Sequence, residues 1–211
     1  MHLLARTARD LDKAAQSMGP TATAHQCDVT DADALSSTVR DILSGAGGAP
    51  DILVNNAGLF PLGALDATEP ESFEQTIQAN LIAPFRLLRL LLPHMRTRGS
   101  GHVVTIGSVA DRLIFPGNGA YSASKFGQRA LHEVLLTELR GTSLRATLVS
   151  PAATDTPIWD PVDPDNTPGF PKRSQMLRAA DVADAVLWAV TRPAGVNIDE
   201  LRLSATLKAA G

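Results

Sequence analysis

The chain has 211 residues, 44% of them hydrophobic and 19% charged, a mixture typical of one globular domain rather than a disordered protein. Its net charge of −3 offers no basic surface for nucleic acid, and its single cysteine, Cys27, excludes an internal disulfide and indicates a reducing compartment. The most apolar run, residues 81–95, contains Arg86, Arg89 and two prolines. We therefore expect no membrane span and a cytoplasmic location.

Short apolar segments alternate with amphipathic helices along the chain. Strands are expected at residues 2–5, 21–27, 51–56, 102–108, 145–150 and 200–204. Helices are expected at residues 8–18, 31–45, 71–97, 120–140 and 180–191, with an irregular proline-rich segment at 151–173. Strands of this length, separated by helices, predict a single α/β domain over residues 1–211, with a parallel sheet covered on both faces.

Polar residues cluster where the expected strands end. Asp28, Asn55, Ser108 and Pro151 each lie at or just past a strand's last residue. Because ligands of open parallel sheets bind at the carboxyl ends of the strands, this placement favours a binding site over scattered surface polarity.

The only tyrosine, Tyr121, precedes Lys125 by four residues, so both side chains share one face of the expected helix. A free phenol has a pKa of about 10 and exchanges protons poorly at neutral pH. A cation about 4 Å away contributes at most roughly 4 kcal/mol, or about three pK units, at an effective dielectric near 20. Taken alone, however, such a pair is common on protein surfaces.

Three further features strengthen the functional interpretation of this pair. Ser108 ends a strand thirteen residues before Tyr121, where its hydroxyl could hold a substrate oxygen against the phenol. The sequence NNAG at 55–58 follows a buried strand, and its glycine allows close approach to a ligand. Asn80 lies inside an expected helix, an unusual place for an amide unless it forms local hydrogen bonds.

Together these motifs resemble those of the short-chain dehydrogenase/reductase family over nearly the whole chain. The matching residues are NNAG at 55–58, Asn80, Ser108, YSASK at 121–125 and SPAATDT at 150–156. The resemblance implies a Rossmann-like doubly wound sheet in three α/β/α layers. It also implies hydride transfer between a nicotinamide cofactor and a carbonyl or alcohol substrate.

The resemblance assigns four catalytic roles. Tyr121 would be the acid/base and Ser108 would orient the substrate oxygen. Lys125 would lower the pKa of Tyr121 and hold the nicotinamide ribose, while Asn80 would support a water relay to Lys125.

The same resemblance assigns cofactor contacts, which Tyr121 and Lys125 would share. Arg6, directly after the first strand, favours the 2′-phosphate of NADP over NAD, although an arginine there is often only a solvated cap. Asp28 and Val29 would border the adenine ring, and an N-cap formed by Asp28 or Thr30 is compatible with that role. The remaining expected contacts are Asn55, Ala57, Gly58, Pro151, Thr154 and Thr156; Pro151 is followed by Ala152 where the family has glycine.

One part of the family pattern is absent. The family begins with a strand and a glycine-rich turn that binds the cofactor's pyrophosphate, whereas this chain begins at the equivalent of the second strand. In the family's strand order 3-2-1-4-5-6-7 the first strand is central, so its absence is expected to leave two unpaired edges. Either Met1 is an internal methionine of a longer enzyme, which the intact catalytic set favours, or the chain is a cofactor-deficient fragment acting as a subunit or binding module.

The expected partners are a small-molecule carbonyl or alcohol and a second copy of the chain. Helices 72–97 and 120–140 have apolar faces suited to a homodimer or homotetramer. The five histidines lack metal-ligand spacing, so no metal site is expected. Apolar candidates for the substrate pocket are Leu59, Phe60, Ala110, Leu113 and Trp159.

Overall fold

The structure, a computed structural model, describes residues 1–45 and 48–206. The strands are β1 (His2–Ala5), β2 (Thr23–Gln26), β3 (Ile52–Asn55), β4 (Gly101–Ile106), β5 (Leu144–Pro151), β6 (Thr154–Asp155), β7 (Leu177–Arg178) and β8 (Glu200–Leu203). The α-helices are α1 (Ala8–Met18), α2 (Ala32–Gly45), α3 (Pro70–Ile77), α4 (Ala83–Arg98), α5 (Gly119–Leu139) and α6 (Ala179–Val190). Short turns of helix complete the order: η1 (Leu65–Ala67), the π-helical η2 (Gln78–Ile82), η3 (Val109–Asp111), η4 (Pro157–Trp159) and η5 (Arg173–Gln175).

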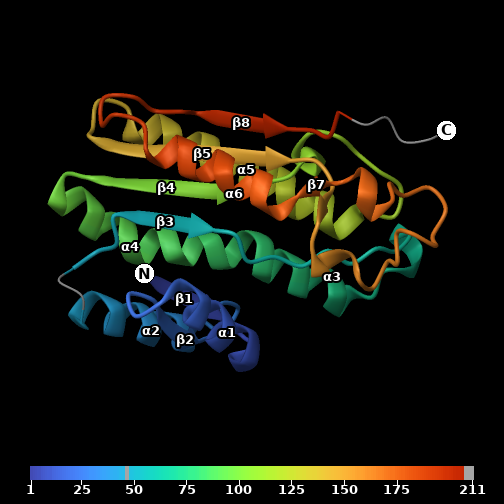
Figure 1. Cartoon of the computed structure of the whole chain (residues 1–211), viewed down its shortest axis with the longest axis horizontal. Coiled ribbons are helices and arrows are strands. Elements are labelled where there is room, and N and C mark those ends of the chain that lie inside the picture. Colours follow the sequence, from blue (N-terminus) through green and yellow to red (C-terminus); the bar gives the residue numbers. More distant parts are fainter. Residues whose placement is uncertain (46–47, 207–211) are drawn as a thin grey trace.

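Four parallel strands form the main sheet in the order β3-β4-β5-β8. Its register places Ile52 opposite His102 and Leu148 opposite Glu200. A second parallel pair, β1-β2, lies beside the β3 edge of this sheet, and β6-β7 forms a two-residue ladder (Figure 1). Because the strands run in one direction, their carboxyl ends meet at one edge, where the predicted site residues lie.

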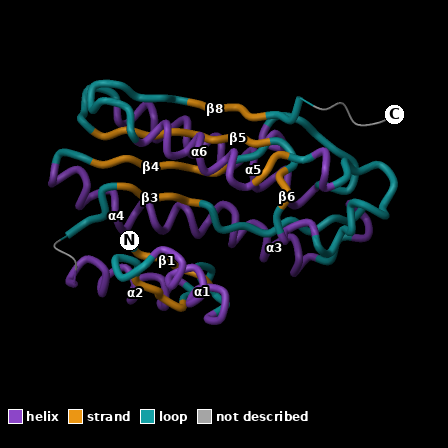
Figure 2. Tube along the Cα trace, in the orientation of Figure 1, coloured by secondary structure: helices purple, strands orange, loops and turns teal. Residues whose placement is uncertain are grey.

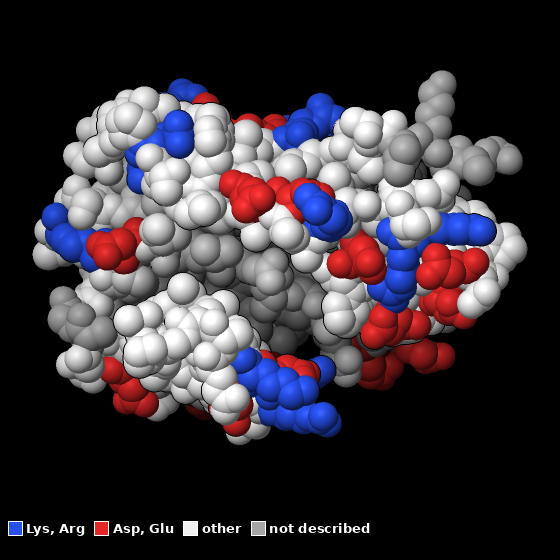
Figure 3. Space-filling view, in the orientation of Figure 1, with Lys and Arg blue, Asp and Glu red and all other residues white. Residues whose placement is uncertain are grey.

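The sheet is divided where the sequence predicts. Within residues 1–45 and 48–206, β1 pairs only with β2, and β3 pairs only with β4 on its other side. On β3, Ile52 and Val54 remain 42% and 45% exposed, whereas a central strand of a covered parallel sheet is buried on both faces. The surface is hollowed between the β1–β2 unit and the main sheet (Figure 3). The predicted doubly wound, three-layer fold with an interrupted strand order is confirmed.

Helices cover both faces of the main sheet, with α4 and α5 on one face and α6 on the other (Figure 2). The core beneath α4 and α5 continues into the β1–β2 unit, because α2 packs against α4. The guanidinium of Arg86 on α4 also donates to the carbonyl of Thr30 at 2.8 Å. These contacts hold the two sheets together without strand pairing. The core consists mainly of Cys27, Leu35, Val39, Leu53, Leu88, Leu91, Met95, Val103, Leu135, Leu139, Leu144 and Ala146.

Two sequence-based expectations about local structure are wrong. The expected helix at 71–97 is interrupted by the π-helical turn η2, which contains Asn80; such turns often mark functional positions. The N-cap expected from Asp28 or Thr30 is instead formed by Asp31, whose Oδ1 accepts from the backbone of Asp33 and Ala34 at 3.0 Å. Asp28 closes a turn by accepting from the Thr30 backbone and hydroxyl, so its carboxylate is engaged before α2 begins.

In the described part of the chain, every helix is too short or too polar to cross a membrane.

Two fully buried histidines lie between the main sheet and its neighbours. His102 Nε2 is 2.8 Å from Thr147 Oγ1, and His132 Nδ1 is 2.9 Å from Thr105 Oγ1. Burial lowers the pKa of each imidazole from 6.5 to about 4. Both rings are therefore neutral in the folded protein at neutral pH.

We predict that the free energy of unfolding falls as the pH drops from 6.5 toward 4. Between pH 6.5 and 4, the two histidines bind protons in the unfolded chain but remain neutral in the folded one. The stability that depends on their being neutral is therefore fully present above pH 6.5. Each proton contributes about 1.4 kcal/mol per pH unit within that window. Urea unfolding across the window should show the slope, and His132→Gln should reduce it, whereas the exposed-site control His94→Gln should not. An equal slope in His132→Gln and the parent would contradict this origin.

Candidate active site

Tyr121 and Lys125 share one face at the start of α5, as the sequence predicts. Lys125 Nζ lies 5.6 Å from the centroid of the Tyr121 ring. Lys125 is 5% exposed, and its ammonium donates to Ile106 O and Gln128 Oε1, each at 2.9 Å. Ile106 is the last residue of β4, so this bond ties the ammonium to the strand that precedes Ser108.

Burial dominates the ionisation of both groups. It lowers the pKa of Lys125 from 10.5 to about 8, and it raises the pKa of Tyr121 above 10. A hydrogen bond with the Ser108 side chain opposes the rise at Tyr121, whereas the charge of Asp111 adds to it. The expected lowering of the Tyr121 pKa by Lys125 stays a prediction: burial is the largest influence on this pKa, and the ammonium donates to Ile106 and Gln128.

Ser108 is brought beside Tyr121 by the turn between β4 and η3. It caps η3 by accepting from the backbone of Ala110 at 3.2 Å. This contact fixes the hydroxyl at the strand end, where it reaches the phenol. The turn after β4 and helix α5 thus bring the hydroxyls of Ser108 and Tyr121 together.

Asn80 joins the loop after β3 to helix α5. Its Oδ1 accepts from Leu59 N at 2.7 Å, and its Nδ2 donates to Leu59 O and to Ser124 Oγ, each at 2.9 Å. Ser124 Oγ in turn donates to the carbonyl of Tyr121 at 2.7 Å. A side chain added at Gly58 would come within 3.1 Å of Asn80 Oδ1, so glycine here allows close approach to Asn80. The amide positions Tyr121 through Ser124, and its water relay to Lys125 stays a prediction.

The expected cofactor residues lie at the carboxyl edge of the two sheets. Arg6 is exposed directly after β1, and its charge contributes to lowering the pKa of Asp28, for which hydrogen bonds from Thr30 are the larger cause. Thr154 forms β6 and donates to Ala152 O at 2.9 Å. The others follow their strands in the same way: Asp28 and Val29 after β2, Asn55 at the end of β3, Ala57 and Gly58 after β3, Pro151 at the end of β5, and Thr156 after β6.

Asn55 provides a structural test of whether a polar cofactor fits this edge. Both polar atoms of its side chain are buried without a partner in the described part of the chain. Buried amides of this kind are rare unless a ligand or water satisfies them. They therefore fit a polar group entering beside the open edge of β3. A glycine-rich turn leading into a helix N-terminus, which would bind pyrophosphate, is not found among the described residues.

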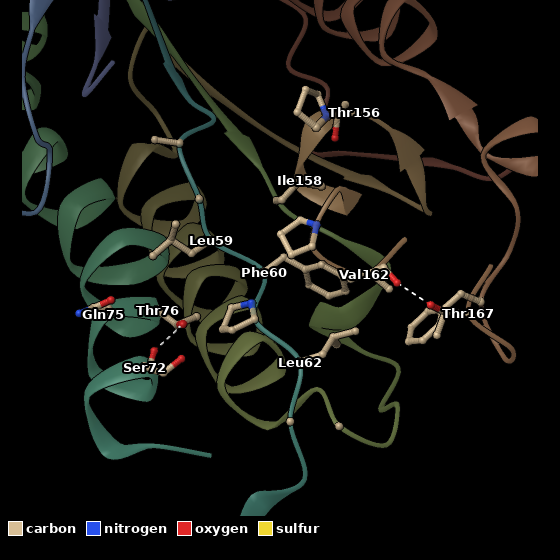
Figure 4. Close-up of a pocket in the computed structure, with 18 of the residues that line it drawn as sticks. Leu59, Phe60, Leu62, Ser72, Gln75, Thr76, Thr156, Ile158, Val162 and Thr167 are labelled. Atoms are coloured by element: carbon tan, nitrogen blue, oxygen red, sulfur yellow. Dashed lines mark hydrogen bonds between the residues drawn. The ribbon is translucent and has the colours of Figure 1, made fainter. Parts of the chain in front are cut away.

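An apolar pocket of about 1210 Å³ opens beside the loop after β3 (Figure 4). Phe60 lines it, whereas Tyr121 and Ser108 are not among its lining residues. Phe60 belongs to the loop after β3 and faces the segment 156–170 across the pocket. Its ring centroid is 4.7 Å from that of Tyr121. Of the predicted pocket residues, Leu59 and Phe60 line it. Trp159 packs against Phe60 with a ring-centroid distance of 4.9 Å, but Trp159, Ala110 and Leu113 are not among the residues that line this pocket, so their contact with substrate stays a prediction.

The pocket carries no charge among its described lining residues. Arg173 lies just after the segment 156–170 that lines the pocket. Its guanidinium pairs with Asp155 at 2.7 Å and with Asp160 at 2.6 Å, and it donates to Thr156 O. It holds the segment in place, and its charge is balanced by the two carboxylates.

Three further residues of the site were missed by the sequence analysis. Gln128 lies three positions after Lys125, so helical spacing could have placed it beside the ammonium. Ser124 lies within YSASK, but only its contact with Asn80 reveals its role. Asp111 has no sequence signal, because its partners lie on distant elements.

Comparison with known proteins identifies the family. A model described as short chain dehydrogenase matches residues 1–167. The chain is 34% identical to the sepiapterin reductase of Chlorobaculum tepidum, over 97% of this chain and 82% of that protein. It is also similar to the crystal structure of a metagenomic short-chain oxidoreductase in complex with NADP, with a TM-score of 0.79, 30% identity, and coverage of 98% of this chain and 86% of that one. An alcohol dehydrogenase from the archaeon Thermococcus sibiricus, complexed with 5-hydroxy-NADP, gives a TM-score of 0.85 at 27% identity, over 100% of this chain and 87% of that one. The chain therefore belongs to the short-chain dehydrogenase family of oxidoreductases.

Proposed function

We propose that the chain is a nicotinamide-dependent oxidoreductase that interconverts a neutral, apolar carbonyl compound and its alcohol. The observation that carries this proposal is the grouping of Tyr121, Ser108 and the buried Lys125 beside an uncharged pocket. A nicotinamide supplies or accepts the hydride when bound. Asn55, Tyr121, Lys125, Pro151 and Thr154 would hold its nicotinamide side at the strand ends.

In the reducing direction, Tyr121 gives its phenolic proton to the carbonyl oxygen while Ser108 donates a hydrogen bond to the same oxygen. Because burial raises the pKa of Tyr121, the phenol keeps its proton at neutral pH, which is the form a general acid requires. In alcohol oxidation the same proton returns to the phenol oxygen.

The substrate class follows from the pocket lining. Phe60, Leu62, Ile158 and Val162 present apolar surface, and the described lining offers neither a cation for a carboxylate nor an anion for an amine (Figure 4). Burying an unpaired charge there would be costly. A neutral ketone or aldehyde with an aromatic or aliphatic body suits this pocket.

NADP is the proposed preference over NAD. Arg6 is exposed after β1 and forms no ion pair in the described part of the chain, so its guanidinium is free to meet a 2′-phosphate. The similarity to structures that contain NADP or 5-hydroxy-NADP supports the same choice.

A second candidate is a non-catalytic subunit or binding module that binds cofactor poorly. The divided sheet favours it, because the described residues supply no strand and no phosphate-binding turn between β1 and β3. Nucleotide binding distinguishes the two candidates.

We predict that NADPH raises the melting temperature of the 211-residue chain more than NADH does. Losing one charge-assisted contact to the 2′-phosphate should weaken NADPH binding about 10- to 100-fold in Arg6→Ala. Arg40→Ala, an exposed change on α2, is the control and should bind like the parent. The measurement is a thermal shift followed by titration of protein fluorescence. No response to either nucleotide would support the second candidate.

We predict that Tyr121→Phe reduces turnover of a neutral aryl ketone by about 10²- to 10⁴-fold, because the general acid is lost. The NADPH-induced thermal shift should remain, since the ring and its contact with Phe60 are kept. NADPH consumption measures the first quantity. Substantial turnover by the variant would remove Tyr121 from the proposed role.

We also propose that the chain self-associates through α4 and α5. Phe85 on α4 and Phe126 and Val134 on α5 are exposed, although large apolar side chains usually become buried. Light scattering should give at least twice the mass of one chain, and Phe126→Asp should reduce it. Val196→Asp, on an exposed site after α6, should leave the mass unchanged. A monomer at micromolar concentration would contradict this proposal.

A further inference from the structure

Asp111 is a buried carboxylate three residues after Ser108. It is 1% exposed, and every partner of its oxygens is a donor. Oδ1 accepts from Arg112 Nε at 2.7 Å and lies 3.9 Å from Arg129 Nη1, while Oδ2 accepts from Ser150 Oγ at 2.6 Å. A buried charge is tolerated only with such compensation. The carboxylate thereby joins η3 to β5 and α5.

The carboxylate packs against the backbone that carries the catalytic serine. A side chain added at Gly107 would come within 3.2 Å of Asp111 Oδ2 and 3.0 Å of Ser150 Oγ. The preceding residue, Ile106, accepts the hydrogen bond from Lys125 Nζ. The ammonium and the carboxylate are thus held against two consecutive residues at the end of β4, where low polarity strengthens their interaction.

We propose that Asp111 is a positioning residue that fixes the turn bearing Ser108 and places a buried negative charge against the end of β4 to which Lys125 is bound. The effect of Asp111 on turnover rests on the proposed function, whereas its effect on the ionisation of Tyr121 and Lys125 does not.

The ionisation of both partners agrees with this placement. Burial lowers the pKa of Lys125, and Asp111 raises it in opposition. Asp111 also raises the pKa of Tyr121, adding to the effect of burial. A negative charge favours the protonated form of each group, so the two effects have the same sign.

Other charges near α5 do not duplicate this role. Arg112 and Arg129 bind Asp111 itself, and Arg112 also pairs with Glu200. The π turn η2 carries no charged residue, and the carboxylates of α3 are exposed. The charged or titratable groups on the elements around Tyr121 and Lys125 are Glu71 and Glu74 on α3, His102 on β4, Asp111 on η3, Arg112 directly after η3, Arg129, His132, Glu133 and Glu138 on α5, Arg145 on β5, and Glu200 and Arg202 on β8.

The single tyrosine allows a direct test without substrate or cofactor. Ultraviolet absorbance of tyrosinate during an alkaline titration reports Tyr121 alone. In Asp111→Asn the midpoint should move to lower pH by about one unit, the effect of a unit charge roughly 10 Å away at a dielectric near 20. Because this readout needs no turnover, it can succeed or fail independently of the proposed function.

Two controls separate charge from structure. Ser150→Ala removes a hydrogen bond to the same carboxylate but keeps its charge, and Glu200→Gln removes only the outer partner of Arg112. Both should titrate like the parent. The proposal is overturned if Asp111→Asn leaves the midpoint in place, or if Ser150→Ala shifts it equally.

A second measurement follows Lys125 instead of Tyr121 and avoids the high pH at which the tyrosine titration could be disturbed by unfolding. The chain has four lysines, Lys13, Lys125, Lys172 and Lys208, and carbon-13 labelling of their side chains lets NMR follow the lysine that titrates near pH 8. Lys125→Arg assigns that signal. It should move to lower pH in Asp111→Asn and stay in place in Asp111→Glu; an unmoved signal in Asp111→Asn overturns the proposal. If Asp111→Asn does not fold, the smaller neutral variant Asp111→Ser is titrated in its place, with the same outcomes.

Discussion

Burial of the Lys125 ammonium is the constraint on which the site depends. A desolvated cation needs fixed acceptors, and these come from the end of β4 through Ile106 O and from α5 through Gln128 Oε1. The hydrogen bond to Ile106 O holds α5 against the end of β4, two residues before Ser108. The phenol one turn earlier is thereby held beside the serine, and its own desolvation keeps it protonated. Burial therefore fixes the position of the ammonium and, separately, raises the pKa of the phenol.

The divided sheet imposes a second constraint, because two strand edges face each other without pairing. The β1–β2 unit stays attached through the core shared by α2 and α4, and apolar burial of this kind does not require continuous backbone hydrogen bonding. The proposed catalytic residues lie after β4, on η2 and on α5. Arg6, Asp28 and Asn55, proposed to contact the nucleotide, lie at or just after the ends of β1, β2 and β3 on either side of the interruption.

An aromatic series extends from the phenol beside the apolar pocket. Phe60 packs against Tyr121, Trp159 against Phe60, and Phe170 against Trp159, with centroid distances of 4.7, 4.9 and 6.0 Å. Arg173 and its two aspartates hold the segment that carries the last two rings. Under the proposed function, this series gives the substrate body an aromatic surface near Ser108 and Tyr121.

Hydrophobic periodicity in the sequence was enough to place the strands and most helices within a few residues, because local pattern governs which faces are buried. The i, i+4 spacing of Tyr121 and Lys125 was equally local, whereas the expectation of a divided strand order came from the resemblance to the family. The tertiary structure alone decided the π turn at Asn80, the place of Asp111 and the direction of the pKa shift of Tyr121. These depend on desolvation and on partners 21 to 44 residues away, such as Leu59, Ser124 and Ser150. Spacing along one helix reveals a neighbouring charge, but only the folded chain shows how much water is removed from both groups.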